Sequence, residues 1–180
     1  MMENISPDRG KIGEIVPRIT GSISVTSSVL IIFLILNSSS GLSSTYHRLM
    51  FGMSIADILS STGMALTHLP MPRPGISKAV DAYLYQGLRL GNTQTCTAQG
   101  FSIAHGVLST YSYNISLCVY YACAIYFKLK QKTIRNRIEP FFHLFSVFFP
   151  LLITLPNLLR ENYNPAEAWC GMSKSRHNML

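Results

Sequence analysis

Hydrophobic residues gather into four long segments that are separated by polar stretches. The segments cover residues 15–37, 46–69, 96–127 and 140–159. The third is the longest, and the chain carries no Lys, Arg, Asp or Glu between Arg89 and Lys128. A helix of this length spans roughly 45 Å, enough to cross a bilayer with its headgroup zones. The pattern predicts four transmembrane helices.

The third segment also carries a polar stripe. Its members recur at spacings of 4, 3, 4 and 7 residues, which places them on one face of a helix. They are His105, Ser109, Ser112, Ser116 and Cys123. Neighbouring helices have to shield such a stripe from lipid. The third segment is therefore expected to lie inside a bundle.

The connections between the segments define how neighbouring helices run. Residues 37–45 form a short turn rich in Ser and Gly, which makes the first two helices antiparallel neighbours. Residues 70–95 form a longer loop that opens with three prolines and has room for a short helix over 77–88. The predicted fold class is an all-α membrane protein, an antiparallel bundle of four transmembrane helices.

Composition supports lipid as the solvent. Hydrophobic residues make up 48% of the chain and charged residues only 13%, whereas soluble domains carry about a quarter charged residues. The alternative for the first segment is a buried helix of a soluble protein. The presence of three further apolar segments disfavours this alternative. The lipid bilayer is thus the first expected partner.

The net charge of +7 has a clear source. Five cations lie in one interval between apolar segments, as in a cytoplasmic loop beside a membrane. They are Lys128, Lys130, Lys132, Arg135 and Arg137. Nucleic acid is not the expected partner, because these cations lie on neither an amphipathic surface helix nor a sheet. Anionic lipid is the simplest partner for this loop.

Placing the basic loop inside orients the whole chain. Residues 1–14 become an extracellular tail without a cleavable signal peptide, and 161–180 an extracellular loop or tail. Asn4 then lies outside in an N-glycosylation pattern. Cys96 and Cys170 share the outer face and are candidates for a disulfide in an oxidising compartment. We expect a multi-pass protein of the plasma membrane.

One acid, Asp57, lies near the middle of the second segment. An ionisable side chain at that depth costs several kcal/mol and should face the bundle interior. Two interpretations stay open. In the first, Asp57 is neutral and forms hydrogen bonds with neighbouring Ser or Thr side chains. In the second, Asp57 is a functional group that is hydrated or binds a cation.

Residues 43–61 (SSTYHRLMFGMSIADILSS) resemble the first intracellular loop and second helix of rhodopsin-like G-protein-coupled receptors. Cys96 and Cys170 match the cysteines that clamp the third helix of that family to its second outer loop. The pair Trp169-Cys170 is similar to the outer loop of slime-mould cyclic-AMP receptors. The resemblance covers about residues 15–171, the first four of seven helices.

The resemblance implies a site and a set of partners. In rhodopsin-like receptors the matching acid binds sodium with help from a hydroxyl on the third helix, here Thr110. Asp57 and Thr110 would then form a polar switch between the second and third helices. An extracellular ligand is expected around residues 99–105. A heterotrimeric G protein is the partner implied for the loop of five cations.

The sequence also departs from that family. Ser27 or Ser28 stands where the first helix usually has Asn, and Tyr120 and Tyr121 stand where Asp-Arg is usual. The fourth segment lacks the usual Trp, and helices five to seven have no counterpart in these 180 residues. The expectation is a divergent receptor of which this chain is the N-terminal portion.

Three functions remain in competition. The first is a receptor that transduces an extracellular signal, and the second is a small channel or transporter lined by Asp57 and the polar face of the third helix. The third is a truncated fragment that does not signal. An enzyme is not expected, since the chain shows no metal-ligand spacing, phosphate-binding loop or nucleophile motif. No cofactor is expected either.

Overall fold

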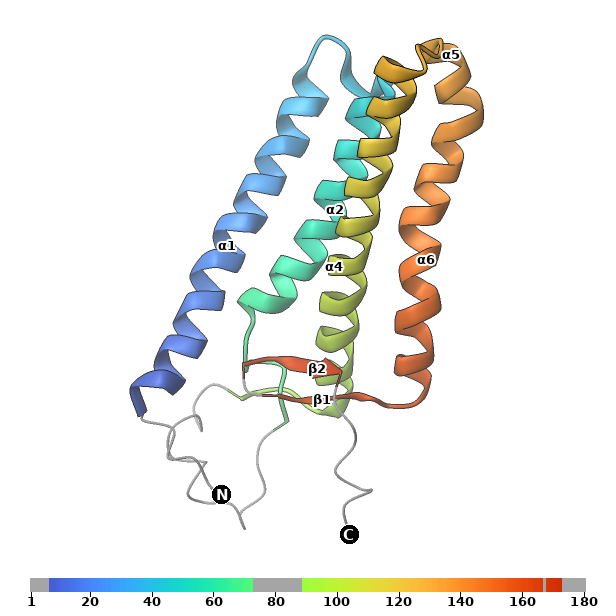
Figure 1. Ribbon diagram of the computed structural model, residues 1–180. Coiled ribbons are helices and arrows are strands. Elements are labelled where there is room, and N and C mark those ends of the chain that lie inside the picture. Colours follow the sequence, from blue (N-terminus) through green and yellow to red (C-terminus); the bar gives the residue numbers. More distant parts are fainter. Residues whose placement is uncertain (1–6, 73–88, 167, 173–180) are drawn as a thin grey trace.

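The protein is mostly helical in the computed structural model, which describes residues 7–72, 89–166 and 168–172. Four long helices lie side by side and alternate in direction along the chain (Figure 1). They are α1 (Pro7–Asn37), α2 (Thr45–Ala65), α4 (Thr93–Tyr121) and α6 (Glu139–Leu159).

Short helical turns connect the long helices at one end of the bundle, which we call the loop end. The 3₁₀ turn η1 (Gly41–Ser43) joins α1 to α2. The connection from α4 to α6 is longer. It consists of the π-helical turn η3 (Ala122–Tyr126), the short helix α5 (Gln131–Thr133) and a second π-helical turn, η4 (Ile134–Ile138).

A two-stranded hairpin lies across the opposite end of the bundle, which we call the hairpin end (Figure 1). Strand β1 (Tyr163–Pro165) pairs antiparallel with β2 (Cys170–Met172), and Asn164 faces Gly171 at the centre of the ladder. The sequence predicted only a polar loop or tail over residues 161–180. Three-residue strands are too short for a period-2 pattern to reveal them.

The predicted helix boundaries need adjustment. The first helix begins at Pro7 instead of residue 15, since proline is compatible with the first position of a helix. The second ends at Ala65 instead of residue 69, and Thr67 has a positive φ of 43° that no regular helix allows. The fourth agrees with its prediction. The predicted short helix over 77–88 and the glycosylation candidate Asn4 lie outside the described residues.

The start of α4 is stabilised by a reciprocal cap. The Asn92 side chain accepts a hydrogen bond from the Thr95 backbone N–H at 2.9 Å, and the Thr95 hydroxyl accepts one from the Asn92 N–H at 2.8 Å. Such a capping box satisfies two donors that a helix start otherwise leaves unpaired. The same hydroxyl is 2.8 Å from the Pro70 carbonyl, to which it donates. The cap therefore also connects α4 to the segment that follows α2.

Helix α4 is the centre of the bundle, because it packs against both α2 and α6, while α1 packs on α2. Glycines allow the helices to approach closely. A Cβ at Gly106 of α4 would lie 2.7 Å from the Ala56 carbonyl of α2, and one at Gly52 would lie 2.7 Å from the Tyr113 ring. Small residues at such contacts are typical of helices that associate in membranes.

Polar and apolar residues are distributed in the reverse of the usual order. The residues of α1 that are buried recur every seventh position: Glu14, Gly21, Ser28 and Ile35. The other faces of α1 expose a large apolar surface, formed by Ile15, Val16, Ile19, Ile23, Val29, Leu30, Phe33, Leu34 and Leu36. Buried serines line the interior elsewhere: Ser54, Ser60, Ser61, Ser109, Ser112, Ser116 and Ser146.

Two helical stretches in the described residues are long and apolar enough to cross a membrane. They are Ile12–Asn37, with a mean hydropathy of 2.2, and Gln131–Leu159, with a mean hydropathy of 1.7. The predictions for the first and fourth segments agree with this measure. Helices α2 and α4 do not reach it, because many Ser, Thr and Gly residues dilute their apolar residues.

Candidate functional site

A disulfide joins the first turn of α4 to the hairpin. The sulfur atoms of Cys96 and Cys170 are 2.02 Å apart, and the two residues are 74 positions apart in the chain. Both cysteines are buried and pack with Met71, which follows α2. The structure thus forms the predicted pair, and the bond holds β2 against α4. Cys118 and Cys123 are free, and Cys118 is exposed.

Gln99 connects three elements at the hairpin end, and the sequence did not single it out as a structural residue. Its amide nitrogen donates to the carbonyls of Gly63, in the last turn of α2, at 2.8 Å and of Thr67, just after α2, at 2.7 Å. Its amide oxygen accepts from the Cys170 backbone N–H at 3.1 Å. The side chain is buried, so each bond replaces one that water would otherwise make. One residue of α4 therefore couples α2 to the hairpin.

Tyr163 fixes the other strand of the hairpin. Its side chain is buried and its hydroxyl donates to the Thr154 carbonyl of α6 at 3.2 Å. Burial raises the pKa of the Tyr163 phenol above its ordinary value. A Cβ at Gly100 would lie 2.8 Å from the Tyr163 ring, so glycine makes room for this tyrosine on α4.

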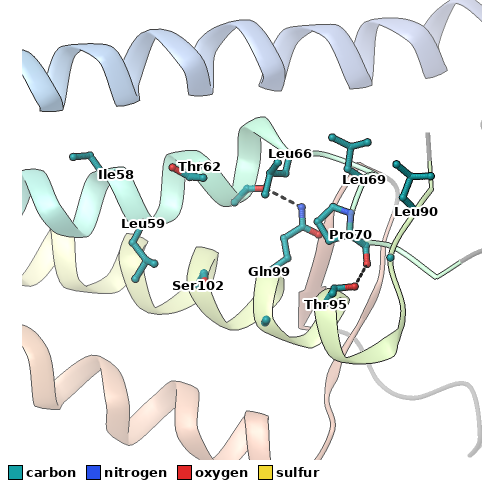
Figure 2. Close-up of a pocket in the computed structure, with 13 residues that line it drawn as sticks. Ile58, Leu59, Thr62, Leu66, Leu69, Pro70, Leu90, Thr95, Gln99 and Ser102 are labelled. Carbon is teal, nitrogen blue, oxygen red and sulfur yellow. Dashed lines mark hydrogen bonds between the residues drawn. The ribbon is translucent and has the colours of Figure 1, made fainter. Parts of the chain in front are cut away.

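A cavity of about 600 Å³ opens beside Gln99, between α2 and α4 (Figure 2). Its walls are mostly apolar, and polar side chains enter from both helices. The lining consists of Ile58, Leu59, Thr62, Gly63, Leu66, Leu69, Pro70, Leu90, Gly91, Thr95, Ala98, Gln99 and Ser102. Apolar walls with a few placed polar groups are typical of sites for small molecules. The predicted ligand region, residues 99–105, contributes Gln99 and Ser102 to it.

Asp57 of α2 is bonded by serines, chiefly from α1. The hydroxyls of Ser24 and Ser28 each donate to its Oδ2 atom at 2.7 Å, and the Ser61 hydroxyl lies 3.4 Å from Oδ1. The structure thus supplies the serine partners of the first interpretation of Asp57. Ser28 is one of the two residues, Ser27 and Ser28, that stand where the resemblance implied an asparagine, and Ser27 instead donates to the Ile23 carbonyl of its own helix.

Thr110, the predicted partner of Asp57, forms no hydrogen bond with it in the part of the chain that the structure describes. Its hydroxyl donates to the Gly106 carbonyl of its own helix at 2.9 Å. Threonine in a helix readily bonds the carbonyl four residues back, and the Asp57–Thr110 switch stays a prediction. Carboxylate and hydroxyl oxygens suit a hard cation, but the donors come from α1 and α2. A sodium ion at Asp57 stays a prediction, and no cluster of three or more His, Cys, Asp or Glu is found among the described residues.

One serine of the polar stripe of α4 pairs with α6. The hydroxyls of Ser116 and Ser146 are buried and lie 3.2 Å apart. The Tyr113 hydroxyl lies 3.2 Å from Nδ1 of His143 on α6. The prediction that neighbouring helices shield the stripe agrees with the burial of Ser109, Ser112 and Ser116. No hydrogen bond joins Asp57 to the stripe among the described residues.

An ion pair at the loop end was missed by the sequence analysis. Arg48 of α2 donates from Nε and Nη2 to the two carboxylate oxygens of Glu139 at the start of α6. The Thr45 hydroxyl donates to the same carboxylate at 2.7 Å. One feature of the sequence could have indicated this ion pair, because Glu139 is the only acid between Asp81 and Glu161. A lone acid beside a predicted membrane segment needs a partner.

The five cations of the predicted inner loop all lie at the loop end. Each is exposed: Lys128, Lys130, Lys132, Arg135 and Arg137. They are remote from the disulfide, because α4 spans the distance between the two ends (Figure 1). The candidate site thus has two separate parts, an open and mostly apolar cavity at the hairpin end and a basic surface at the loop end.

Two comparisons of the sequence with known proteins found no match. No protein-family model matches this chain, and no curated protein matches it. The function therefore has to be argued from the geometry alone.

Proposed function

We propose that this chain is an integral membrane protein whose four long helices all cross the bilayer. Support comes from the exposed apolar faces of α1 and α6, which water would disfavour strongly and lipid would not. Helices α2 and α4 carry more hydroxyls, and their buried serines lie inside the bundle. The bundle thus turns its polar groups inward and its apolar groups outward.

The proposed orientation has the hairpin end and the N-terminus outside and the loop end inside. The density of exposed cations at the loop end supports an inner location. The disulfide supports an outer location for the hairpin end, because disulfides persist in oxidising compartments. The plasma membrane is the proposed location.

Within this orientation we propose a receptor that transduces an extracellular signal, of the kind that G-protein-coupled receptors represent. The observation that carries the proposal is the cavity between α2 and α4, whose wall includes Gln99. An occupant of this cavity would contact a side chain of α4 that bonds both the end of α2 and the hairpin. A shift there would displace long helices whose other ends meet the inner leaflet or a heterotrimeric G protein.

The alternative of a channel or transporter has less support. It required Asp57 and the polar face of α4 to line one pathway. Asp57 bonds to serines of α1 and α2, whereas Ser116 of α4 pairs with Ser146 of α6. An experiment distinguishes the third alternative, a fragment that does not signal, from a receptor.

The test uses the full chain in lipid nanodiscs with a purified heterotrimeric G protein. We expect nucleotide exchange on the G protein to run faster than with empty nanodiscs, and Gln99→Leu to reduce the difference. Gln94→Leu, on an exposed position of the same helix, is the matched control. Exchange equal to that of empty nanodiscs would reject the receptor and favour the silent fragment. Ion flux through proteoliposomes would favour the channel.

A further inference from the structure

The connection from α4 to α6 concentrates positive charge without any compensating acid. From Ala122 to Ile138 the charged residues are the five cations and no Asp or Glu. None of the five forms an ion pair in the part of the chain that the structure describes. The nearest acid in sequence, Glu139, is occupied by Arg48 and Thr45. The charge of the connection is therefore available to an external anion.

The same connection also exposes large apolar side chains next to the cations. Tyr126 is 81% exposed, Phe127 62% and Ile125 71%. The helix unwinds at this point, since η3 is π-helical and Lys128 has a positive φ of 50°. The backbone thus turns at Tyr126, Phe127 and Lys128, which follow one another in the sequence. Aromatic side chains beside cations are typical of the boundary between lipid and water.

The connection is nevertheless anchored to the bundle. Ile134 of η4 is completely buried and packs in the cluster with Leu49 and Tyr120. The Gln131 amide donates to the Tyr120 hydroxyl at 3.3 Å. The cations on both sides of this anchor, Lys132 and Arg135, are consequently presented from a fixed position. A fixed arrangement loses less conformational entropy when it binds a partner.

We propose that the surface formed by residues 122–138 binds the headgroups of anionic phospholipids in the adjoining leaflet, with Tyr126 and Phe127 inserted at the interface. Each cation near such a leaflet contributes on the order of 1 kcal/mol, and the apolar side chains add burial that a soluble polyanion cannot supply. This inference rests on the proposed insertion in a membrane. It is independent of whether the protein signals.

The first experiment measures lipid binding to the full chain in neutral detergent. The probes are short-chain phosphatidylserine and short-chain phosphatidylcholine, titrated by calorimetry. We compare the wild type, the variant K128Q/K130Q/K132Q and a control that removes three cations elsewhere, R160Q/K174Q/R176Q. We expect phosphatidylserine to bind at least tenfold more tightly than phosphatidylcholine. The first variant should lose this preference and the control should keep it.

Three outcomes would overturn the proposal. They are binding of phosphatidylcholine as tightly as phosphatidylserine, equal behaviour of the two variants, and tighter binding of a single-stranded oligonucleotide than of the lipid. The last result would assign the surface to nucleic acid. Increased NaCl should weaken the binding, since exposed charges are screened.

The second experiment tests the aromatic contact in nanodiscs that contain phosphatidylserine. Tyr126→Trp in a Trp169→Phe background provides one fluorophore at the surface. Lipids brominated close to the headgroup should quench it more than lipids brominated at the chain ends, and an unquenched signal would contradict insertion. Extraction of membranes with alkaline carbonate tests membrane insertion separately. A chain that stays embedded and prefers anionic lipid but activates no G protein would reject the receptor alone.

Discussion

Arg48 and Glu139 are 91 residues apart in the chain and meet in a bidentate ion pair that joins α2 to α6 at the loop end. The Glu139 side chain is 8% exposed and that of Arg48 25%. His143, one turn further along α6, lies 3.8 Å from the same carboxylate and contacts Tyr113 of α4. The loop end is thus held by polar contacts among three helices, while the hairpin end is held by a covalent bond.

Removal of one member of this pair should destabilise the bundle. Arg48→Gln leaves the Glu139 carboxylate without its charged partner, and we expect a loss of about 1.5–3 kcal/mol in the free energy of unfolding, the usual range for a hydrogen bond to a charged group. Thermal unfolding in detergent, followed by circular dichroism, measures it. Arg160→Gln, at an exposed position, should change stability by less than about 0.5 kcal/mol.

The double variant tests the pair directly. Arg48→Gln combined with Glu139→Gln should cost less than the sum of the two single changes, because the second change removes a charge that the first left unpaired. Additive costs would show that the two side chains do not interact.

Substitution of a serine beside Asp57 should lower the stability of the protein more than substitution of Thr110. Ser28→Ala removes a hydroxyl that donates to the carboxylate, so we expect a loss of about 0.5–2 kcal/mol, as for polar contacts between helices in membranes. Thr110→Val removes a hydroxyl that bonds only its own helix, and it should be almost neutral. Unfolding of both variants by heat gives the comparison. A larger loss for Thr110→Val would favour the switch that the resemblance implied.

Gln99 should be the most sensitive polar residue of α4. Gln99→Leu leaves the carbonyls of Gly63 and Thr67 and the N–H of Cys170 without their partner, and we expect a loss of at least about 2 kcal/mol. Gln94→Leu is the matched control on the exposed face. Unfolding in detergent measures stability, and proteolysis between Tyr163 and Met172 reports on the hairpin. Equal stability of the two variants would contradict a coupling role.

Two glycine substitutions should have opposite effects on the stability of the protein. Alanine favours helix over glycine by about 1 kcal/mol, and Gly13 has nothing within 4 Å of an added Cβ, so Gly13→Ala should stabilise α1. Gly106→Ala should destabilise, because its Cβ would lie 2.7 Å from the Ala56 carbonyl. The unfolding temperatures of the two variants provide the test. Stabilisation by both would mean that α2 and α4 approach less closely than described.

The disulfide should contribute strongly to stability. Cys170→Ser opens a link between residues 74 positions apart, and the chain-entropy model predicts a loss of about 4 kcal/mol for a loop of this size. Cys118→Ser, at a free and exposed cysteine, is the control and should be neutral. Unfolding with and without reductant checks the result, and reductant should lower the stability of the wild type only to that of Cys170→Ser.

Sequence patterns predicted the helices better than their contacts. The fourth segment, 140–159, agrees with α6 almost residue for residue, because an uncharged run between Glu139 and Arg160 has clear ends. The cysteine pair was also predicted, since both residues lie beyond apolar segments on one side. The hydrogen bond from Thr110 to its own helix was not predicted, because the position of a hydroxyl in the sequence does not show which carbonyl it bonds.

The sequence by itself determined a helical chain with an uncharged centre, a basic connection and two cysteines at one end. These features depend on local composition and on helical periodicity, which can be read along a single chain. Only the tertiary structure decided that Asp57 meets serines of α1, that Arg48 meets Glu139 and that Gln99 joins α2 to the hairpin. Those contacts depend on how each helix is rotated about its axis. That rotation is set by the packing of all the helices together, above all by the close approach at Gly52 and Gly106.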